Sequence, residues 1–230
     1  MNGRMAVLEI VNSIKDFLFP PVCPSCEAAI ISGGLICPDC MDAFTEEAMQ
    51  YDTKPRLIDN VSDISVLLPY TTACRRIVHT LKYRGMPSIG FIMGKLMAQK
   101  TLSRVSLSEN AVLVPVPLHP DRLRERGYNQ SERLAQGFAS FSGHKIRTDI
   151  IKRIRKTETQ TALDHEQRAQ NVQNAFVFCG DTSLSSCEVI LIDDVMTTGS
   201  TISACAGTLR NGGAERITVS VLATPDPGTE

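Results

Sequence analysis

The order of apolar and polar positions along the chain alternates between two periods. Short apolar runs, rich in valine and isoleucine and bounded by turn residues, are typical of buried strands. Between these runs, apolar residues recur every three or four positions, which is typical of helices with one buried face. The pattern predicts strands over residues 64–68, 111–116, 189–193 and 217–223, and helices over residues 72–82, 89–101, 131–141 and 200–210.

Strands and helices that alternate in this way favour an α/β fold with an open, mostly parallel sheet flanked by helices. Glycines near the ends of two of the predicted helices, Gly85 and the Gly212–Gly213 pair, support these boundaries. In sheets of this kind, ligands bind beyond the carboxyl ends of the strands. Residues that directly follow a predicted strand are therefore the first candidates for a functional site.

The N-terminal stretch has a helical pattern of its own. Apolar residues at positions 7, 10, 11, 14, 17 and 18 have helical spacing, and Glu9, Lys15 and Asp16 interrupt the run. No apolar run approaches the roughly 20 residues that a membrane-spanning helix needs. No small-residue cleavage site of a signal peptide follows the run. We therefore expect an amphipathic helix, no membrane span and a protein of the cytoplasm.

Four of the eight cysteines form two closely spaced pairs, Cys23 with Cys26 and Cys37 with Cys40. Each CxxC pair places two thiolates on one tight turn, and two such turns supply the four sulfurs of a tetrahedral zinc site. Disulfides are the alternative, but the expected cytoplasmic location argues against them. Because all four positions are thiolates, the predicted zinc is structural and folds the segment.

A polar, acidic stretch with one proline, residues 41–60, separates the cysteines from the predicted sheet. A change of composition of this kind is typical of a domain boundary. It predicts an N-terminal helix plus zinc ribbon over residues 1–58 and a main α/β domain over residues 59–230.

Charge is unevenly distributed, although the net charge of the chain is only −1. Residues 61–170 contain 18 lysines and arginines against 9 aspartates and glutamates, a net charge of +9. A basic segment of this size indicates an anionic ligand near it. A solvated basic surface is the other interpretation.

Residues 189–201 read VILIDDVMTTGST, and they join a predicted strand to a predicted helix. The strand delivers Asp193 and Asp194 to an edge of the sheet, and a turn containing Gly199 follows. Backbone N–H groups in such a turn, with a helix N-terminus behind them, bind anions. Threonine and serine hydroxyls add neutral donors and cap the helix. The turn lacks the lysine of the Walker loop, which favours a single phosphate monoester.

The two carboxylates cannot bind the same phosphate, because like charges repel. They can instead accept hydrogen bonds from neutral hydroxyls nearby. A ribose 5-phosphate has this arrangement, with a phosphate at one end and a vicinal diol at the other. An ordinary capped strand–turn–helix is the alternative, although two adjacent acids at a buried strand end are costly without a partner.

The same stretch resembles the phosphoribosyl-pyrophosphate (PRPP) signature of type I phosphoribosyltransferases. Other motifs narrow the resemblance to the ComF/GntX family of phosphoribosyltransferase-like proteins. They are the paired CxxC motifs, LKYRG at residues 81–85, VPVPLHPDRLRERGYNQSERLA at residues 114–135 and RIRKTETQTALDHEQRAQNVQNAF at residues 153–176. The resemblance covers nearly the whole chain. It implies a type I phosphoribosyltransferase fold with a small N-terminal zinc ribbon of four cysteines.

The resemblance also implies roles for individual residues. Asp193 and Asp194 would be the catalytic pair that binds the ribose hydroxyls, directly or through Mg²⁺. Five residues of the turn would bind the 5-phosphate: Thr197, Thr198, Gly199, Ser200 and Thr201. Five further residues would meet the pyrophosphate: Lys82, Arg84, Leu118, His119 and Arg122. A flexible loop carrying Gln160 and Arg168 would close over the bound substrate.

The implied reaction is transfer of a 5-phosphoribosyl group, with release of pyrophosphate, to an acceptor that the sequence does not identify. Displacement at the anomeric carbon passes through an oxocarbenium-like state, for which positioning and electrostatic stabilisation suffice. Mg²⁺ and the basic middle of the chain would neutralise the pyrophosphate. A lone loop histidine is weak evidence for a general base, so we interpret His119 as a loop residue.

Three hypotheses follow for the function. The first is a Mg²⁺-dependent phosphoribosyltransferase, and the second is a non-catalytic protein of the same fold that senses PRPP or a nucleotide. The third rests on the link between the family and natural competence: a DNA-uptake factor that handles single-stranded DNA. The zinc ribbon and the basic segment are compatible with the third hypothesis. The nearly neutral net charge and the few aromatic residues count against it.

Overall fold

The computed structural model describes residues 20–31, 33–52, 57–155, 175–180, 184–185 and 187–225. Its centre is a five-stranded sheet with the order β1-β7-β6-β2-β3, in which every neighbouring pair is parallel. The strands are β1 (Asp63–Pro69), β2 (Val112–Pro115), β3 (Lys145–Ile146), β6 (Glu188–Val195) and β7 (Arg216–Thr224). A separate antiparallel pair consists of β4 (Ile151–Arg153) and β5 (Phe176–Phe178). The open parallel sheet expected from the sequence is confirmed.

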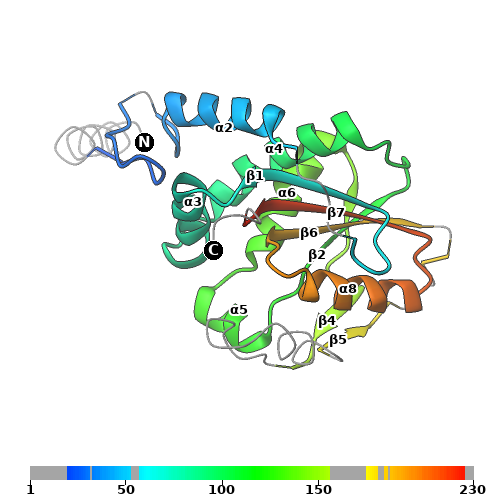
Figure 1. Cartoon of the computed structure of the whole chain (residues 1–230). Helices are drawn as coiled ribbons and strands as arrows, with labels where there is room; N and C mark the ends of the chain where they lie inside the picture. Colours follow the sequence, from blue (N-terminus) through cyan, green and yellow to red (C-terminus); the bar gives the residue numbers. More distant parts are fainter. Residues whose placement is uncertain are drawn as a thin grey trace, which may run out of the picture.

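Helices cover both faces of this sheet (Figure 1). One face is covered by α2 (Pro38–Gln50), α3 (Thr72–Tyr83), α4 (Pro87–Arg104) and α6 (Gln130–Ser142). The other face is covered by α8 (Ser200–Asn211) and the β4–β5 pair. The short helix α5 (Pro120–Arg126) lies near the edge of the sheet to which β6 and β7 point.

Strand β6 shows why the apolar run in the sequence has no polar interruption. Ile190 and Ile192 belong to the buried cluster formed with α3, α4 and α6, whereas Val189 and Leu191 belong to the cluster formed with α8. All four side chains are fully buried. A parallel strand covered on both faces therefore carries apolar residues at successive positions rather than at alternate ones.

The chain connections place a crevice at the carboxyl ends of β2 and β6, which are neighbours in the sheet. From β2 the chain continues through α5 and α6 to β3, and from β6 it continues through α8 to β7. The two connections run over opposite faces and lead to opposite sides of the sheet. Such a topological switch point is where open α/β sheets bind ligands.

Helices α4 and α6 pack with their backbones in contact. A Cβ atom on Gly94 would lie 2.0 Å from the carbonyl oxygen of Leu134, and one on Gly137 would lie 2.0 Å from that of Phe91. Only glycine fits at either position, because no real Cβ atom comes this close to an oxygen. This close packing fixes α6, whose first turn carries Ser131 at the crevice.

Every strand and helix predicted for residues 64–223 is present, with ends that shift by a few residues at most. Elements with weaker patterns were not predicted: α2, α5, β3, β4 and β5. The helix predicted at the N-terminus lies outside the described residues. Within the described part of the chain, no helix is long and apolar enough to cross a membrane.

The first half of the acidic stretch expected to be a domain boundary, residues 41–50, belongs to the helix α2. Its buried residues, Phe44 and Ala48, join the same apolar cluster as α3 and α4. After α2, the carbonyl oxygen of Tyr51 accepts a hydrogen bond of 2.6 Å from Nζ of Lys100 in α4, which also donates to the carbonyl of Leu67. Burial lowers the pKa of Lys100 to about 8. The N-terminal segment is thus joined to the main core, and the division at residue 58 stays a prediction.

Candidate functional site

The carboxylates of Asp193 and Asp194 lie at the end of β6 and are almost completely buried, with 7% and 4% of their surface exposed. One oxygen of Asp193, Oδ1, accepts hydrogen bonds from the hydroxyl of Ser131 at 2.9 Å and from the backbone N–H of Asp194 at 2.8 Å. Oδ1 of Asp194 accepts from the backbone N–H of Val195 at 2.7 Å. These bonds fix both carboxylates at the switch point.

A lysine from α3 neutralises part of this charge. Nζ of Lys82, in the last turn of the helix, lies 2.8 Å from Oδ2 of Asp194. Burial acts to lower the pKa of Lys82, but the charges of Asp194 and Asp193 outweigh it and raise that pKa. The lysine is therefore charged at neutral pH, and its one positive charge faces two carboxyl groups.

Asp193 titrates far from the usual range of an aspartate. Burial, and then the neighbouring charge of Asp194, raise the pKa of Asp193 to about 7, although Lys82 and the hydroxyl of Ser131 act to lower it. A buried carboxylate is costly unless it is paired. This site therefore favours an incoming cation or a set of hydroxyl donors, which would supply what Lys82 alone does not.

The turn after β6 adopts a conformation suited to an anion. Gly199, at the N-cap of α8, has a φ angle of +81°, which L side chains rarely adopt. The hydroxyls of Thr198 and Ser200 lie 2.8 Å apart and share a hydrogen bond. Residues 195–202 line a cavity of about 230 Å³ together with Tyr70, Lys82 and Asp193. The predicted phosphate-binding residues 197–201 thus line the same cavity as Asp193, at the carboxyl end of β6.

A second cavity, of about 260 Å³, lies next to the first and shares Lys82 with it. Its other lining residues are Tyr83, Gly85, Arg122, Glu125 and Arg126. The ring of Tyr83 is 66% exposed, and the guanidinium of Arg126 lies 5.5 Å from its centre. With two arginines and a lysine against one glutamate, the lining of this cavity carries a net positive charge.

The structure separates the residues predicted to meet the pyrophosphate. Lys82 and Arg122 line the second cavity, whereas Arg84, Leu118 and His119 line neither of the two cavities. His119 is the N-cap of α5, where its Nδ1 accepts a hydrogen bond of 3.2 Å from the backbone N–H of Asp121. This capping bond agrees with its interpretation as a loop residue. Gln160 and Arg168 lie outside the described residues.

Tyr70 and Ser131 lie at this site but were not among the residues predicted to bind the ligand. Tyr70 directly follows β1, so the rule that ligands bind beyond strand ends could have found it. Ser131 is held by its neighbour Asn129, which caps α6 and donates a 3.0 Å hydrogen bond to the carbonyl of Val116. No sequence pattern pairs Ser131 with Asp193, because their contact depends on the packing of α6 against β6.

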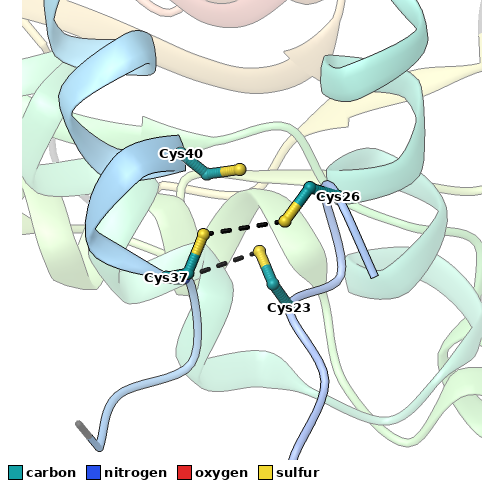
Figure 2. Close-up of side chains that lie close together, drawn as sticks. All are labelled: Cys23, Cys26, Cys37 and Cys40. Carbon is teal, nitrogen blue, oxygen red and sulfur yellow. Dashed lines mark hydrogen bonds between the residues drawn. The ribbon is translucent and has the colours of Figure 1, made fainter. Parts of the chain in front are cut away.

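The four paired cysteines converge in space, as Figure 2 shows. Their Sγ atoms all lie within 4.8 Å of one another, and those of Cys26 and Cys37 are 3.7 Å apart. Sulfurs at the corners of a zinc tetrahedron, each about 2.3 Å from the metal, are about 3.8 Å apart. A disulfide would need about 2.05 Å. The geometry fits a four-cysteine zinc site, and Cys23, Cys26, Cys37 and Cys40 are the residues that would hold a structural zinc.

These features define a class of protein. Its members have a parallel α/β domain with paired carboxylates and an anion-binding turn at one strand end, preceded by a zinc ribbon of four cysteines. A family model described as a double zinc ribbon domain matches residues 14–50. Two curated relatives match over most of the chain. They are the DNA utilization protein YhgH of Salmonella typhimurium, 30% identical over 87% of this chain and 89% of its own, and competence protein ComFC of Bacillus subtilis, 30% identical over 86% and 82%.

The chain belongs to the ComF family of phosphoribosyltransferase-like proteins. Among solved structures, a hypoxanthine phosphoribosyltransferase from Staphylococcus aureus is similar over 64% of this chain and 69% of its own. It is 10% identical in sequence, with a TM-score of 0.35. This likeness is too weak to bear on the reaction or the substrate.

Proposed function

We propose that the protein binds PRPP at the end of β6 and transfers its 5-phosphoribosyl group to an acceptor, with release of pyrophosphate. The observation that carries the proposal is the cavity at the end of β6. The Gly199 turn, the Asp193 carboxylate and the ammonium group of Lys82 all line it. PRPP consists of a 5-phosphate, a ribose diol and a pyrophosphate. The Gly199 turn complements the phosphate, the Asp193 carboxylate complements the diol, and the ammonium group of Lys82 complements the pyrophosphate.

The ligand would lie across both cavities. The turn over residues 197–201 would bind the 5-phosphate, and Asp193 and Asp194 would accept hydrogen bonds from the ribose hydroxyls. The pyrophosphate would lie toward Lys82 and Arg122, because these two cations line the second cavity. Asp193 and Asp194 are also the residues that would hold Mg²⁺, which would supply positive charge to the pyrophosphate.

In the proposed reaction, the bond from the anomeric carbon to the pyrophosphate oxygen breaks, and a bond to the acceptor nucleophile forms. The electron pair of the broken bond leaves with the pyrophosphate. The protein would hold the reacting atoms in line and stabilise the negative charge that develops on the leaving group. No covalent nucleophile from the protein is needed, so buried carboxylates and nearby cations suffice.

Calorimetric titration with PRPP and Mg²⁺ tests the proposal. Wild-type protein is compared with the Asp193→Asn/Asp194→Asn double variant and with Asp149→Asn, a control whose exposed carboxylate pairs with Arg147. The proposal expects binding in wild type and control that is lost in the double variant. No binding by the wild type would overturn it.

A screen for pyrophosphate release then separates an enzyme from a sensor. The enzyme hypothesis expects release with at least one acceptor among nucleobases, amines and nucleic acids, and loss of that release in the double variant. PRPP binding without release against every acceptor would favour the non-catalytic sensor instead.

Handling of single-stranded DNA is the second candidate function. Two relatives are named for competence or for DNA utilization, and Tyr83 is an exposed ring flanked by His79 and Arg126 beside the basic cavity. Exposed rings next to arginines bind single strands by stacking and charge. The hypothesis expects salt-sensitive binding of an oligonucleotide that weakens about tenfold in Tyr83→Ala, a loss within the range for one base stack. Absence of binding at low salt would remove this candidate.

We place the protein in the cytoplasm, because four thiolates that bind zinc need a reducing compartment. The geometry of the four cysteines supports this location. Fractionation of cells that express the chain with a small tag would test it, and recovery in a membrane or secreted fraction would contradict it.

A further inference from the structure

Helix α3 contacts both the four-cysteine cluster and the carboxylate pair. Near its start, Nη1 of Arg76 donates a 2.9 Å hydrogen bond to the backbone carbonyl of Ser25, which lies between Cys23 and Cys26 in the sequence. Near its end, Lys82 pairs with Asp194. The two contacts are six residues apart, about 9 Å along one helix. A shift of the helix at one contact therefore moves the other.

Burial strengthens the mechanical connection between these two contacts. Ser25 is only 5% exposed, and Cys74 of α3 is fully buried. Ile77 and Leu81 on the apolar side of α3 belong to the same buried cluster as Cys23 and Cys37. Close-packed interiors transmit displacement because they contain few voids.

The phosphate-binding turn is connected differently. Met196 and Ile202, which bracket the turn, belong to the other buried cluster, on the α8 face of the sheet. The carboxylates lie between the two faces, and only their lysine partner comes from α3. A disturbance at the cysteines should therefore reach the lysine before it reaches the 5-phosphate position.

We propose that zinc binding at the four-cysteine cluster and ligand binding at the end of β6 are thermodynamically coupled through α3. The inference rests on the proposed function, since the ligand in question is PRPP. With zinc bound, the first CxxC turn is rigid and presents the Ser25 carbonyl to Arg76. Without zinc, four thiol groups have no common partner and the turn loses its fixed shape. Helix α3 then loses this anchor, and Lys82 is held less well against the carboxylates and the pyrophosphate.

Coupling of this kind is reciprocal, so PRPP must tighten zinc binding by the same factor as zinc tightens PRPP binding. We expect a factor of about five, at the low end of allosteric couplings, because a single hydrogen bond and one packed helix carry it. Ribose 5-phosphate lacks the pyrophosphate that would meet Lys82, so its affinity should depend less on zinc. The difference between the two ligands separates this route from a general loss of structure.

The variant Arg76→Met tests the route in zinc-loaded protein, with Arg75→Met as its matched control. Arg75 is the neighbouring arginine on α3, and no hydrogen bond among the described residues joins its side chain to the zinc ribbon. Calorimetry gives the PRPP affinity, and competition with a chromophoric chelator gives the zinc affinity. We expect Arg76→Met to weaken PRPP binding about fivefold, and Arg75→Met to leave it unchanged. Equal affinities in Arg76→Met and wild type would overturn the inference.

Amide hydrogen exchange of the ligand-free protein provides a readout that does not depend on PRPP. Removal of zinc should accelerate exchange at residues 79–84 and leave residues 203–207 of α8 unchanged. Unchanged exchange at residues 79–84 would overturn the coupling. If wild type fails to bind PRPP, the proposed function fails, and this exchange experiment still decides whether zinc controls α3.

Discussion

The four-cysteine cluster and the Asp193–Asp194 pair are both groups of acids that the fold brings together, but their charge is balanced in different ways. The four cysteines lie within one stretch of 18 residues, residues 23–40, and their geometry fits a metal ion that would satisfy all four sulfurs at once. The carboxylates are balanced by a single lysine from another helix. The first arrangement is complete once zinc binds, whereas the second leaves one carboxyl group undercompensated.

This difference separates structural chemistry from binding chemistry. A saturated zinc site has no position left for a substrate, so it does not itself bind one. A buried carboxylate whose pKa is raised still gains from a new partner, because burial disfavours its charge. Lys82 can also exchange its partner Asp194 for a phosphate oxygen, since it lines both cavities. The incomplete balance at the end of β6 is what makes that region a candidate site.

The largest expected effect comes from removing a zinc ligand. Cys37→Ser should reduce the zinc content from about one ion per chain to near zero, since one cluster of four cysteines binds one ion. It should also unfold residues 20–50, because zinc binding supplies about 10–16 kcal/mol to small zinc domains. Metal analysis and thermal unfolding measure the two effects. Cys179→Ser is the control, an exposed cysteine outside the cluster. Zinc retained by Cys37→Ser would contradict a four-cysteine site.

Removal of Lys82, which pairs with Asp194, should have a smaller effect on stability. Lys82→Met leaves Asp194 buried without its partner, and breaking a buried ion pair from one side costs about 3 kcal/mol. Adding Asp194→Asn should recover part of that loss, because the second change removes the uncompensated charge. Urea unfolding of the wild type, both single variants and the double variant measures the coupling. Additive losses would mean that the pair contributes no mutual stabilisation.

The same comparison explains how much the sequence could predict. All four cysteines of the cluster were predicted, because two CxxC turns point to a metal site from local spacing alone. The carboxylates and the turn were predicted because a strand, two acids and a glycine follow one another within residues 189–201. In both regions, the residues that carry the chemistry are close to one another in the sequence.

The partners of these residues were harder to predict, because they come from distant parts of the chain. Lys82 was expected near the pyrophosphate and is found paired with Asp194, 112 positions later. Ser131 was not predicted at all, since its contact with Asp193 depends on how α6 packs on the sheet. Helix α2 was missed because it buries only Phe44 and Ala48, and a mostly polar helix has a weak apolar period.

The raised pKa of Asp193 predicts a pH dependence opposite in direction to that of the zinc cluster, whose cysteines must lose their protons to bind the metal. The folded protein holds the Asp193 proton up to about pH 7, whereas an ordinary aspartate releases it near 3.8. Between these values the folded state binds more protons than the unfolded state, so the free energy of unfolding falls as pH rises. The slope from this group is at most about 1.4 kcal/mol per pH unit.

Asp193→Asn should remove that contribution to the slope. Urea unfolding at pH 5, 6 and 7 measures it, with Asp149→Asn as the control for an exposed aspartate. The slope of the free energy of unfolding against pH should be more negative in wild type and control than in Asp193→Asn. Parallel lines for all three proteins would mean that Asp193 is already ionised at pH 5 in the folded state.

The smallest expected effect concerns the hydroxyl of Ser131, which donates to Asp193 at 2.9 Å. Ser131→Ala should cost about 1 kcal/mol of stability, the usual contribution of one hydrogen bond, because the backbone N–H of Asp194 still donates to the same oxygen. It should also raise the pKa of Asp193 further, since that bond acts to lower it. Carboxyl-carbon NMR across the titration measures the pKa, and Ser131→Thr, which keeps a hydroxyl, should restore it. If the alanine and threonine variants titrate alike, Lys82 and the backbone set the charge of Asp193. The carboxylate pair would then resemble the zinc cluster, because a single cation would balance its charge. Neutral donors such as the Ser131 hydroxyl would contribute little to that balance.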